Sequence, residues 1–189
     1  MAYDSATGNV VLFGGNNMSG GNGAFADTWI WNGLTRSWTQ QHPGSSPSAR
    51  GSIQLIYDQT TQKVVLFGGT TANLATLNDT WTWNGTTWTQ QFPASAPSAR
   101  NGAALAYDPG LAAVLLFGGA VGICCSNNVN DTWTWNGTNW TQIFPSSTLP
   151  SSRNTPGMVY DSSSKVVLLF GGQASNVVLG DTWRLTLAP

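Results

Sequence analysis

The chain has 189 residues, of which 41% are hydrophobic and only 8% are charged, and its formal net charge is -1. This length allows one domain with a sizeable core. The scarcity of charge leaves no basic surface that could neutralise a phosphate backbone, so we expect no nucleic-acid partner. The longest apolar run, Leu111 to Phe117, is too short to span a bilayer, and the first residues do not resemble a signal peptide.

Two short motifs recur through the chain. Tyr-Asp begins at residues 3, 57, 107 and 160, and Phe-Gly-Gly begins at residues 13, 67, 117 and 170. A recurrence at a fixed period of roughly fifty residues indicates a protein built from structural repeats. Each repeat is expected to contain four short strands, which we name A to D in chain order.

Strands A and B form the first half of each repeat. Strand A ends in Tyr-Asp and is expected at 52–57, 102–107 and 157–160. Strand B is expected at 10–13, 64–67, 114–117 and 166–170, and it is apolar on both faces, as a buried strand is. The Asp after Tyr suits the A–B turn because its side chain can accept backbone N–H groups. Glycine pairs that allow a bend or a close backbone approach follow strand B, at Gly14, Gly15, Gly68, Gly69, Gly118, Gly119, Gly171 and Gly172.

Strands C and D form a hairpin, which is clearest at 78–92 (NDTWTWNGTTWTQQF). Two runs rich in Thr and Trp flank Asn84-Gly85, a dipeptide that predicts a two-residue type I′ turn. The hairpin returns at 131–144 and, more loosely, at 27–41, and its first half returns at 181–183.

Four short strands in about fifty residues, without helical periodicity, are typical of a β-propeller blade. The sequence therefore predicts an all-β fold, a β-propeller of four four-stranded blades whose first and last blades are incomplete. The blades are expected at about 1–47, 48–97, 98–150 and 151–189, within a single propeller domain or propeller fragment.

The glycine pairs and the strand D tryptophans Trp38, Trp88 and Trp140 resemble those of kelch repeats, the blade type also found in galactose oxidase. The resemblance covers essentially the whole chain and implies kelch-type blades. Strand C departs from many kelch repeats, since it has Trp-x-Trp where they have Tyr, a variant similar to repeats in uncharacterised bacterial proteins. A galactose-oxidase copper site would need two His and two Tyr, whereas His42 is the single His here. We therefore expect no such activity, no metal and no cofactor.

The charged residues fall at repeat positions. Glu is absent, and each of the eight Asp either follows Tyr or precedes Thr-Trp. A residue needed once per repeat is explained most simply by the geometry of the repeat, so no catalytic carboxylate is predicted. We expect ion pairs that tie one blade to the next, and a place for the ten Trp in the core between blades rather than on a sugar-binding surface. The ion pairs would be formed by Asp27, Asp79, Asp131 and Asp181 with Arg50, Arg100 and Arg153.

An up-and-down strand order places the B–C and D–A loops on one face. The B–C loops differ in length and sequence, as ligand-binding loops do. The predicted ligand-binding residues there are Asn16, Asn17, Asn73, Cys124, Cys125, Asn127 and Asn176. Cys124-Cys125 has no counterpart in the other repeats, and the sequence leaves open a vicinal disulfide, free thiols or pairing with another chain.

These features predict a non-catalytic binding or assembly module with a protein or glycan ligand. The polar, Glu-free and Lys-poor composition favours an extracellular location. The alternative is a carbohydrate-binding or carbohydrate-active propeller domain of an enzyme. Because strand A of the first repeat is short and the fourth repeat lacks a strand D, we expect either a longer polypeptide or self-association through the end blades, with a closed four-blade monomer as the alternative.

Overall fold

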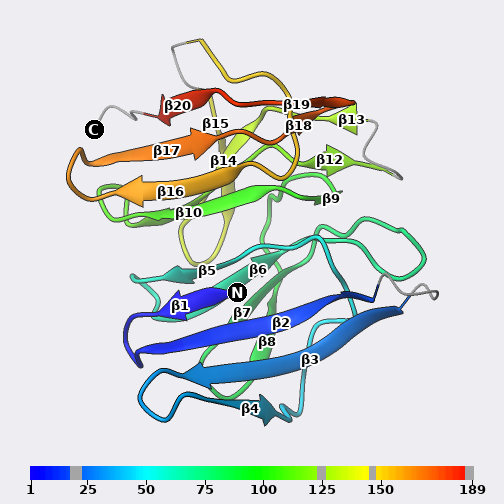
Figure 1. Cartoon of the computed structure of the whole chain (residues 1–189), viewed down its shortest axis with the longest axis vertical. Coiled ribbons are helices and arrows are strands. Elements are labelled where there is room, and N and C mark those ends of the chain that lie inside the picture. Colours follow the sequence, from blue (N-terminus) through cyan, green and yellow to red (C-terminus); the bar gives the residue numbers. More distant parts are fainter. Residues whose placement is uncertain (18–22, 123–126, 145–147, 186–189) are drawn as a thin grey trace.

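The computed structural model describes residues 1–17, 23–122, 127–144 and 148–185, and every regular element in those ranges is a β-strand. Four antiparallel sheets follow one another in chain order, from the first at the bottom of Figure 1 to the fourth at the top. Within the described ranges there is no helix long and apolar enough to cross a membrane.

Each large sheet is one predicted repeat. Blade 1 contains β1 (Ala2–Asp4), β2 (Asn9–Asn17), β3 (Gly23–Asn32) and β4 (Ser37–Gln41). Blade 2 contains β5 (Leu55–Asp58), β6 (Lys63–Phe67), β7 (Thr80–Trp83) and β8 (Trp88–Gln91). Blade 3 contains β10 (Ala104–Asp108), β11 (Ala113–Phe117), β14 (Thr132–Trp135) and β15 (Trp140–Ile143). Blade 4 contains β16 (Gly157–Asp161), β17 (Val166–Phe170) and β20 (Thr182–Leu185).

Shorter strands extend the loops that leave strand B. A small sheet of blade 3 joins β9 (Arg100–Asn101), β12 (Ala120–Val121) and β13 (Asn127–Asn128). In blade 4, β18 (Gln173–Ala174) pairs with β19 (Val177–Val178). The strand order within every blade follows the chain, as expected for up-and-down sheets.

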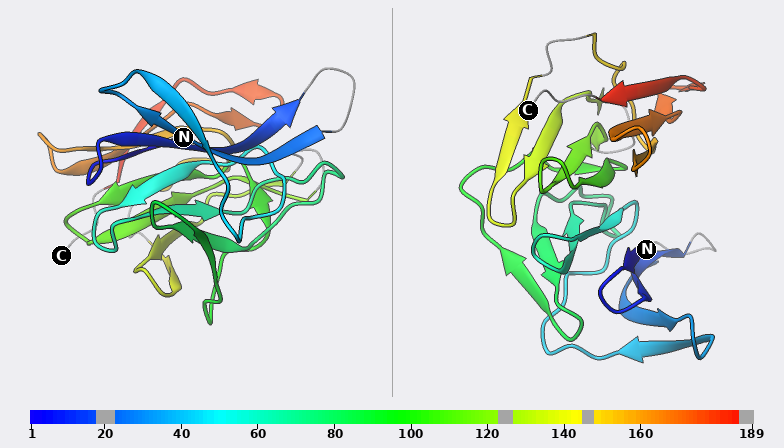
Figure 2. Two further views of the ribbon diagram at one scale, coloured as in Figure 1. Left: turned by 90° about the horizontal axis from the view of Figure 1, so that it is seen from below. Right: turned by 90° about the vertical axis from the view of Figure 1, so that its left-hand side faces the viewer.

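The A strands are the inner strands of the blades. They lie beside one another in order, β1 next to β5, β5 next to β10 and β10 next to β16. In the right-hand view of Figure 2 the blades follow one another along the molecule, and blades 1 and 4 lie at the two ends of the arrangement. This radial order of small antiparallel sheets is that of a β-propeller and confirms the predicted fold class.

The hydrophobic core lies between the blades. In β6, Val64 and Leu66 face blade 1 while Val65 and Phe67 face blade 3, because successive side chains of a strand point to opposite faces. The core between blades 3 and 4 is the smallest, with three fully buried members, Ala106, Leu115 and Val167.

A strand D tryptophan closes each of the first two cores. Trp88 of blade 2 packs edge-on against Phe13 of blade 1, with ring centroids 5.3 Å apart, and its Nε1–H donates to Thr28 Oγ1 at 3.0 Å. Trp140 of blade 3 repeats this contact on blade 2: it packs on Phe67 at 5.3 Å and donates to the hydroxyl of Thr80 at 2.9 Å. Each indole thus fills a fixed place on the preceding blade.

The prediction that all ten Trp lie in the inter-blade core is too broad. It holds for five tryptophans that are buried in the cores between blades, Trp81, Trp83, Trp88, Trp135 and Trp140. Trp38, the strand D tryptophan of blade 1, has 44% of its surface exposed. The difference is physical: in the described structure no blade precedes blade 1, so its strand D tryptophan has no phenylalanine of an earlier blade to pack on.

The predicted type I′ turn is wrong. Trp83 pairs with Trp88, so the hairpin loop spans the four residues between them, and only Gly85 in it has a positive φ, of 98°. The side chain of Asn84 explains the longer loop, since its Oδ1 accepts the backbone N–H groups of Thr86 and Thr87 at 3.0 and 2.9 Å.

The A–B turns agree with the prediction. Oδ1 of Asp58 accepts the N–H groups of Thr60 and Thr61, and Oδ1 of Asp4 accepts those of Ala6 and Thr7. This Asp therefore closes the turn through its side chain.

Candidate functional site

The B–C loops all lie at one end of the sheets. In Figure 1 the far ends of β2 and β3, the loop between β6 and β7, and the strands β12, β13, β18 and β19 gather on the right-hand side. The D–A segment that contains β9 reaches the same side. We refer to this end of the molecule as the loop face.

The structure places the described candidate residues on the loop face in two different situations. Asn16 and Asn17 lie at the end of β2, and the amide of Asn16 packs directly onto Gly51, where any side chain at position 51 would collide with it. Asn73, Asn127 and Asn176 are exposed on three successive loops. No hydrogen bond in the described ranges joins Asn16, Asn73, Asn127 and Asn176 to one another. The candidates Cys124 and Cys125 lie outside the described residues.

A polar network that the sequence reading missed connects the loops of blades 3 and 4. The Asn154 amide donates to Oδ1 of Asn128 at 2.9 Å, and the Asn128 amide donates to the carbonyl of Gln173 at 2.9 Å. Asn154 is buried. A signal was present in the sequence: Asn101 and Asn154 each follow a repeat Arg, where the second repeat has Gly51. In the second repeat this position is Gly51, and the side chain of Asn16 from the preceding blade occupies the space that an Asn side chain at position 51 would need.

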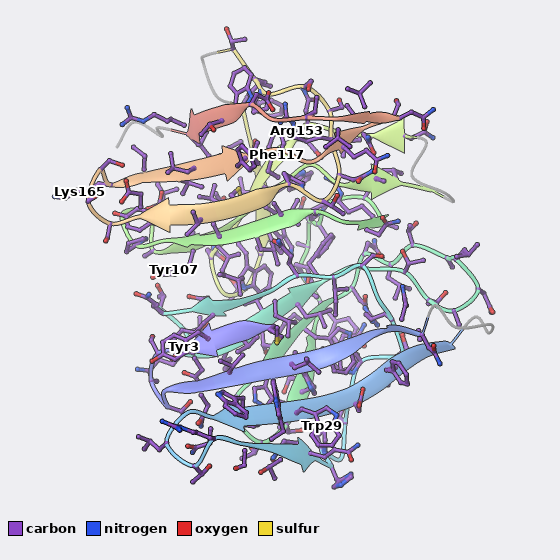
Figure 3. The ribbon with its side chains drawn as sticks, in the orientation of Figure 1. Tyr3, Trp29, Tyr107, Phe117, Arg153 and Lys165 are labelled. Carbon is purple, nitrogen blue, oxygen red and sulfur yellow. The ribbon has the colours of Figure 1, made fainter. Side chains whose placement is uncertain are left out.

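The loop face carries almost no charge. The four B–C loops contain no Asp, Lys or Arg between residues 16–26, 70–78, 120–130 and 173–180. The lysines lie at the other end of the blades, beside the A–B turns, as Lys165 does in Figure 3. The loop face therefore offers uncharged hydrogen-bonding groups, chiefly Asn, Thr and backbone amides.

A repeated ion pair supports the loop face in blades 2, 3 and 4. Arg50 enters blade 2 fully buried, and its Nη1 and Nη2 donate to Oδ1 and Oδ2 of Asp79 at 2.5 and 2.9 Å. Nη1 also donates to the carbonyl of Gly68, and Nε donates to that of Ser48. Arg153, labelled in Figure 3, is held in the same way. Such bidentate, charge-assisted bonds are strong and fix the geometry of both partners.

A tryptophan completes the ion pair. Oδ2 of Asp79 also accepts Nε1–H of Trp81 at 2.7 Å, because residues i and i+2 of a strand share a face. Burial by itself raises the pKa of the Asp79 carboxyl, but the hydrogen bonds from Arg50 and Trp81 outweigh it and lower this pKa below its usual range. The pKa of Asp131 is lowered for the same reasons.

The prediction that the ion pairs tie one blade to the next is wrong. Each ion pair joins two residues of the same repeat. The backbone of the arginine makes the connection instead. The N–H of Arg50 donates to the carbonyl of Phe25 in blade 1, and its carbonyl accepts the N–H of Gly15 at 2.9 Å. Each arginine is therefore anchored on one blade by its main chain and on the next blade by its side chain.

Asp27 of blade 1 is the fourth copy of this carboxylate. Its Oδ2 accepts Nε1–H of Trp29 at 2.6 Å, like the other copies. Among the described residues no arginine forms an ion pair with it. Nor do any three His, Cys, Asp or Glu side chains of the described residues lie close enough to hold a metal ion.

Radial four-stranded blades, glycine pairs after strand B and tryptophans in strand D define a β-propeller of the kelch type. The chain belongs to this family, since the model of the KLHDC2/KLHL20/DRC7 Kelch-repeats domain matches residues 2–188. A search of the curated proteins found none that matches. Among solved structures the chain is similar to YjhT, with a TM-score of 0.67 and 16% identity over 87% of this chain and 50% of that one. The chain thus spans about half the length of that structure, and the likeness concerns the fold.

Proposed function

We propose that this chain is a non-catalytic binding or assembly module whose loop face binds an uncharged polar surface of a protein or glycan. The main support for a non-catalytic role is that the Asp side chains are all engaged in structural hydrogen bonds. The Asp residues that follow Tyr close the A–B turns, and those that precede Thr-Trp accept an indole N–H. Side chains occupied in this way hold the blades together and are poor candidates for acid–base catalysis.

The location that we propose is extracellular. It rests on the polar, Glu-free and Lys-poor composition of the chain. The neutral loop face also bears on the ligand, because a surface without charge gains nothing from an anionic partner. We therefore expect binding through hydrogen bonds and apolar contacts, with little dependence on salt.

The end blades support the proposed assembly role. Phe170 of blade 4 is 59% exposed, whereas its counterpart Phe117 in blade 3 is 5% exposed. At the other end, Tyr3 is 61% exposed and its counterpart Tyr57 is 6% exposed. Apolar surface of this kind favours association, either with copies of the chain or with further blades. Light scattering over a range of concentrations tests self-association, and a monomer at every concentration would contradict it.

Binding to arrays of glycans and of folded proteins tests the loop face. The triple variant Asn73→Ala, Asn127→Ala and Asn176→Ala should lose the binding of any ligand found. A control variant at the opposite end, Lys63→Ala with Lys165→Ala, should keep it. Equal binding by the two variants would exclude the loop face as the site.

The array result also separates the two candidate functions. Ligands that are glycans would support the carbohydrate-binding alternative. Release of reducing sugar from such a glycan, lost in a folded Asp27→Asn variant, would show an enzyme and contradict the proposed non-catalytic role.

A further inference from the structure

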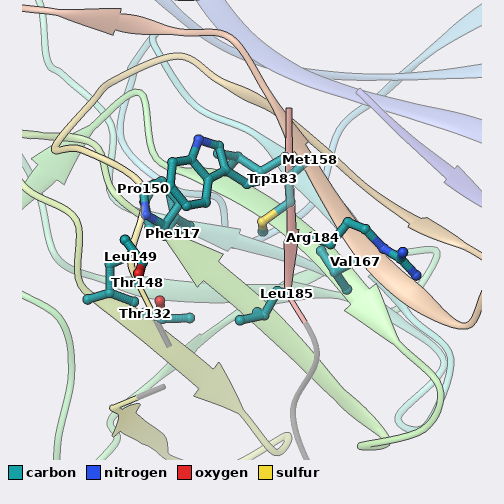
Figure 4. Close-up of a pocket in the computed structure, with 11 residues that line it drawn as sticks. Phe117, Thr132, Thr148, Leu149, Pro150, Met158, Val167, Trp183, Arg184 and Leu185 are labelled. Atoms are coloured by element: carbon teal, nitrogen blue, oxygen red, sulfur yellow. The ribbon is translucent and has the colours of Figure 1, made fainter. Parts of the chain in front are cut away.

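A pocket between blades 3 and 4 is lined mainly by apolar side chains. Figure 4 shows Phe117, Met158 and Leu185 among the side chains around it. Among the described residues Arg184 is the only charged side chain in this lining, and Phe117 is only 5% exposed. Such a lining belongs to the packing of one blade on the next. Side chains that are placed for a chemical reaction lie elsewhere, in the C–D hairpins at the end of the molecule opposite the loop face.

The C–D hairpin loops of blades 2 and 3 begin with the same tripeptide, Asn-Gly-Thr. The two copies are Asn84-Gly85-Thr86 and Asn136-Gly137-Thr138. In blade 2 the side-chain oxygen Oδ1 of Asn84 accepts the N–H and the hydroxyl of Thr86, both at 3.0 Å. It also accepts the N–H of Thr87 at 2.9 Å.

Blade 3 repeats this arrangement. Oδ1 of Asn136 accepts the N–H of Thr138 at 3.0 Å, the hydroxyl of Thr138 at 2.9 Å and the N–H of Asn139 at 2.8 Å. Asn84 and Asn136 are both exposed. Several fixed donors around one carbonyl oxygen have the character of an oxyanion hole, because they stabilise negative charge that develops on that oxygen.

The group that can attack this carbonyl carbon is the backbone nitrogen of the glycine that follows. The hydrogen bond from Thr86 N–H to Oδ1 of Asn84 closes a small ring of atoms, and this ring contains both Cγ of Asn84 and the nitrogen of Gly85. Gly85 is exposed, and among the described residues no hydrogen bond uses its N–H. A residue without a side chain also leaves its own nitrogen open to approach.

We propose that Asn84 and Asn136 are self-modification sites, where the fold promotes the conversion of the Asn side chain to a carboxylate through a cyclic imide. Hydroxide takes the proton of the Gly N–H, the nitrogen forms a bond to Cγ of the Asn, and Oδ1 takes up the negative charge. The side-chain nitrogen then leaves as ammonia with a proton from water, which regenerates the hydroxide. Water opens the imide ring to Asp or isoaspartate. The proposal goes beyond the binding role and does not depend on it.

The hydrogen bonds to Oδ1 promote this reaction because they become stronger as charge develops on that oxygen. Asn32-Gly33, in the hairpin of blade 1, offers an internal comparison. Oδ1 of Asn32 accepts the N–H groups of Leu34 and Thr35, but no hydroxyl donates to it, because Leu34 stands where the other copies have Thr. Asn32 also belongs to β3, where pairing restrains its backbone. We therefore expect a slower reaction at Asn32.

The two proposed sites differ in access. Nothing lies within 4 Å of a Cβ added to Gly85. A Cβ added to Gly137 would lie 2.7 Å from a methyl carbon of Thr61, so Gly137 is packed against blade 2. The rate should therefore be highest at Asn84, lower at Asn136 and lowest at Asn32.

The modification changes the charge of the hairpin tips and leaves the loop face neutral. An Asp at position 84 keeps an oxygen that can accept the same hydrogen bonds. Isoaspartate instead adds an atom to the main chain of the short loop between Trp83 and Trp88. We therefore expect the folded chain to form a higher ratio of Asp to isoaspartate than a free peptide does.

The test incubates the folded full chain at neutral pH and follows each Asn by peptide mapping with mass spectrometry, which separates Asp from isoaspartate. The synthetic peptide TWNGTTW, the sequence of residues 82–88, is the unstructured reference. Asn84 should react about tenfold faster in the folded chain than in this peptide. Thr86→Val removes the hydroxyl donor, and should slow the reaction at Asn84 about threefold to tenfold while Asn136 is unaffected.

Thr87→Val is the matched control, because the N–H of Thr87 donates to Asn84 whereas its hydroxyl does not. It should leave the rate at Asn84 unchanged, and near-ultraviolet circular dichroism verifies that both variants are folded. A rate at Asn84 in the folded chain equal to or below that of the peptide would overturn the proposal. Equal rates in the Thr86→Val and Thr87→Val variants would overturn the role of the hydroxyl and with it the proposal.

Discussion

In blade 3 the guanidinium of Arg100 faces the carboxylate of Asp131 side by side, with Nη1 2.6 Å from Oδ1 and Nη2 2.8 Å from Oδ2. The arginine is almost wholly buried, while about a fifth of the aspartate side chain is exposed. Two oppositely charged groups of matching shape therefore meet where the D–A loop enters a blade. Removal of either partner leaves the other charge without compensation.

The first prediction concerns this pair. Asp131→Asn should lower the free energy of unfolding by about 3 kcal/mol, because the buried Arg100 loses its counter-charge. Asp27→Asn is the matched control, since that Asp has the same tryptophan partner and no arginine among the described residues; it should cost about 1 kcal/mol. Urea unfolding followed by tryptophan fluorescence measures both, and equal losses would contradict the assigned role of the arginine.

Acid should destabilise the protein through the same carboxylates. The pKa values of Asp79, Asp131 and Asp181 are lowered in the folded state, so their stabilisation is complete above the unfolded value of about 3.9 and is lost as the pH falls through it toward the folded values. The urea midpoint should stay nearly constant from about pH 7 to 5 and decrease below about pH 4. Asp131→Asn should flatten that decrease, and a midpoint that rises in acid would refute the prediction.

The tryptophans of strand D should differ sharply in their effect on stability. Trp140→Ala removes the indole that packs on Phe67 and donates to Thr80, and should cost about 3–5 kcal/mol. Trp38→Ala changes the equivalent residue of blade 1, which is half exposed, and should cost clearly less. Thermal and urea unfolding compare the two variants, and similar losses would show that burial between blades is not the source of the effect.

Glycine is required after strand B for a steric reason. Gly118 has a φ of 66°, and a Cβ there would lie 2.7 Å from the carbonyl oxygen of Arg153. Gly118→Ala should therefore destabilise the fold by about 2 kcal/mol or more. Gly44→Ala serves as the control because nothing lies within 4 Å of its added methyl group. Denaturant midpoints that fall equally in both variants would contradict this explanation.

Much of the fold could be predicted because it repeats. The predicted bounds of strand B agree with the structure to within one residue in blades 2, 3 and 4. An apolar run before Phe-Gly-Gly must be buried, and a buried central strand is the element that allows this. The turn type predicted at Asn84 is wrong because the Asn side chain competes with the backbone as an acceptor of the same N–H groups. The sequence alone does not show which of the two arrangements is more stable. The hydrogen bond from Trp81 to Asp79 could have been predicted from the sequence, because residues i and i+2 of a strand lie on the same face.

The contacts on the loop face and between the blades were harder to predict. The role of Asn16 depends on Gly51 of the next repeat, a contact between residues far apart in the chain. Each strand D tryptophan packs on the phenylalanine of the blade before it, as Trp140 does on Phe67, and that direction is a property of the three-dimensional arrangement. Periodicity identifies equivalent positions; it does not show which neighbours they contact.

The division of each repeat arginine between two blades has a consequence for unfolding. The main chain of the arginine is hydrogen-bonded to one blade and its side chain to the next blade. Neither blade can therefore open without loss of hydrogen bonds that link it to its neighbour. This is the nearest-neighbour coupling that makes an array of repeats melt as a unit. Arg100→Met would weaken this coupling at the middle of the array, although the core that Phe67 and Trp140 share would remain. Amide exchange should then become faster beside residue 100 in blades 2 and 3 than in the same blades of the unaltered protein.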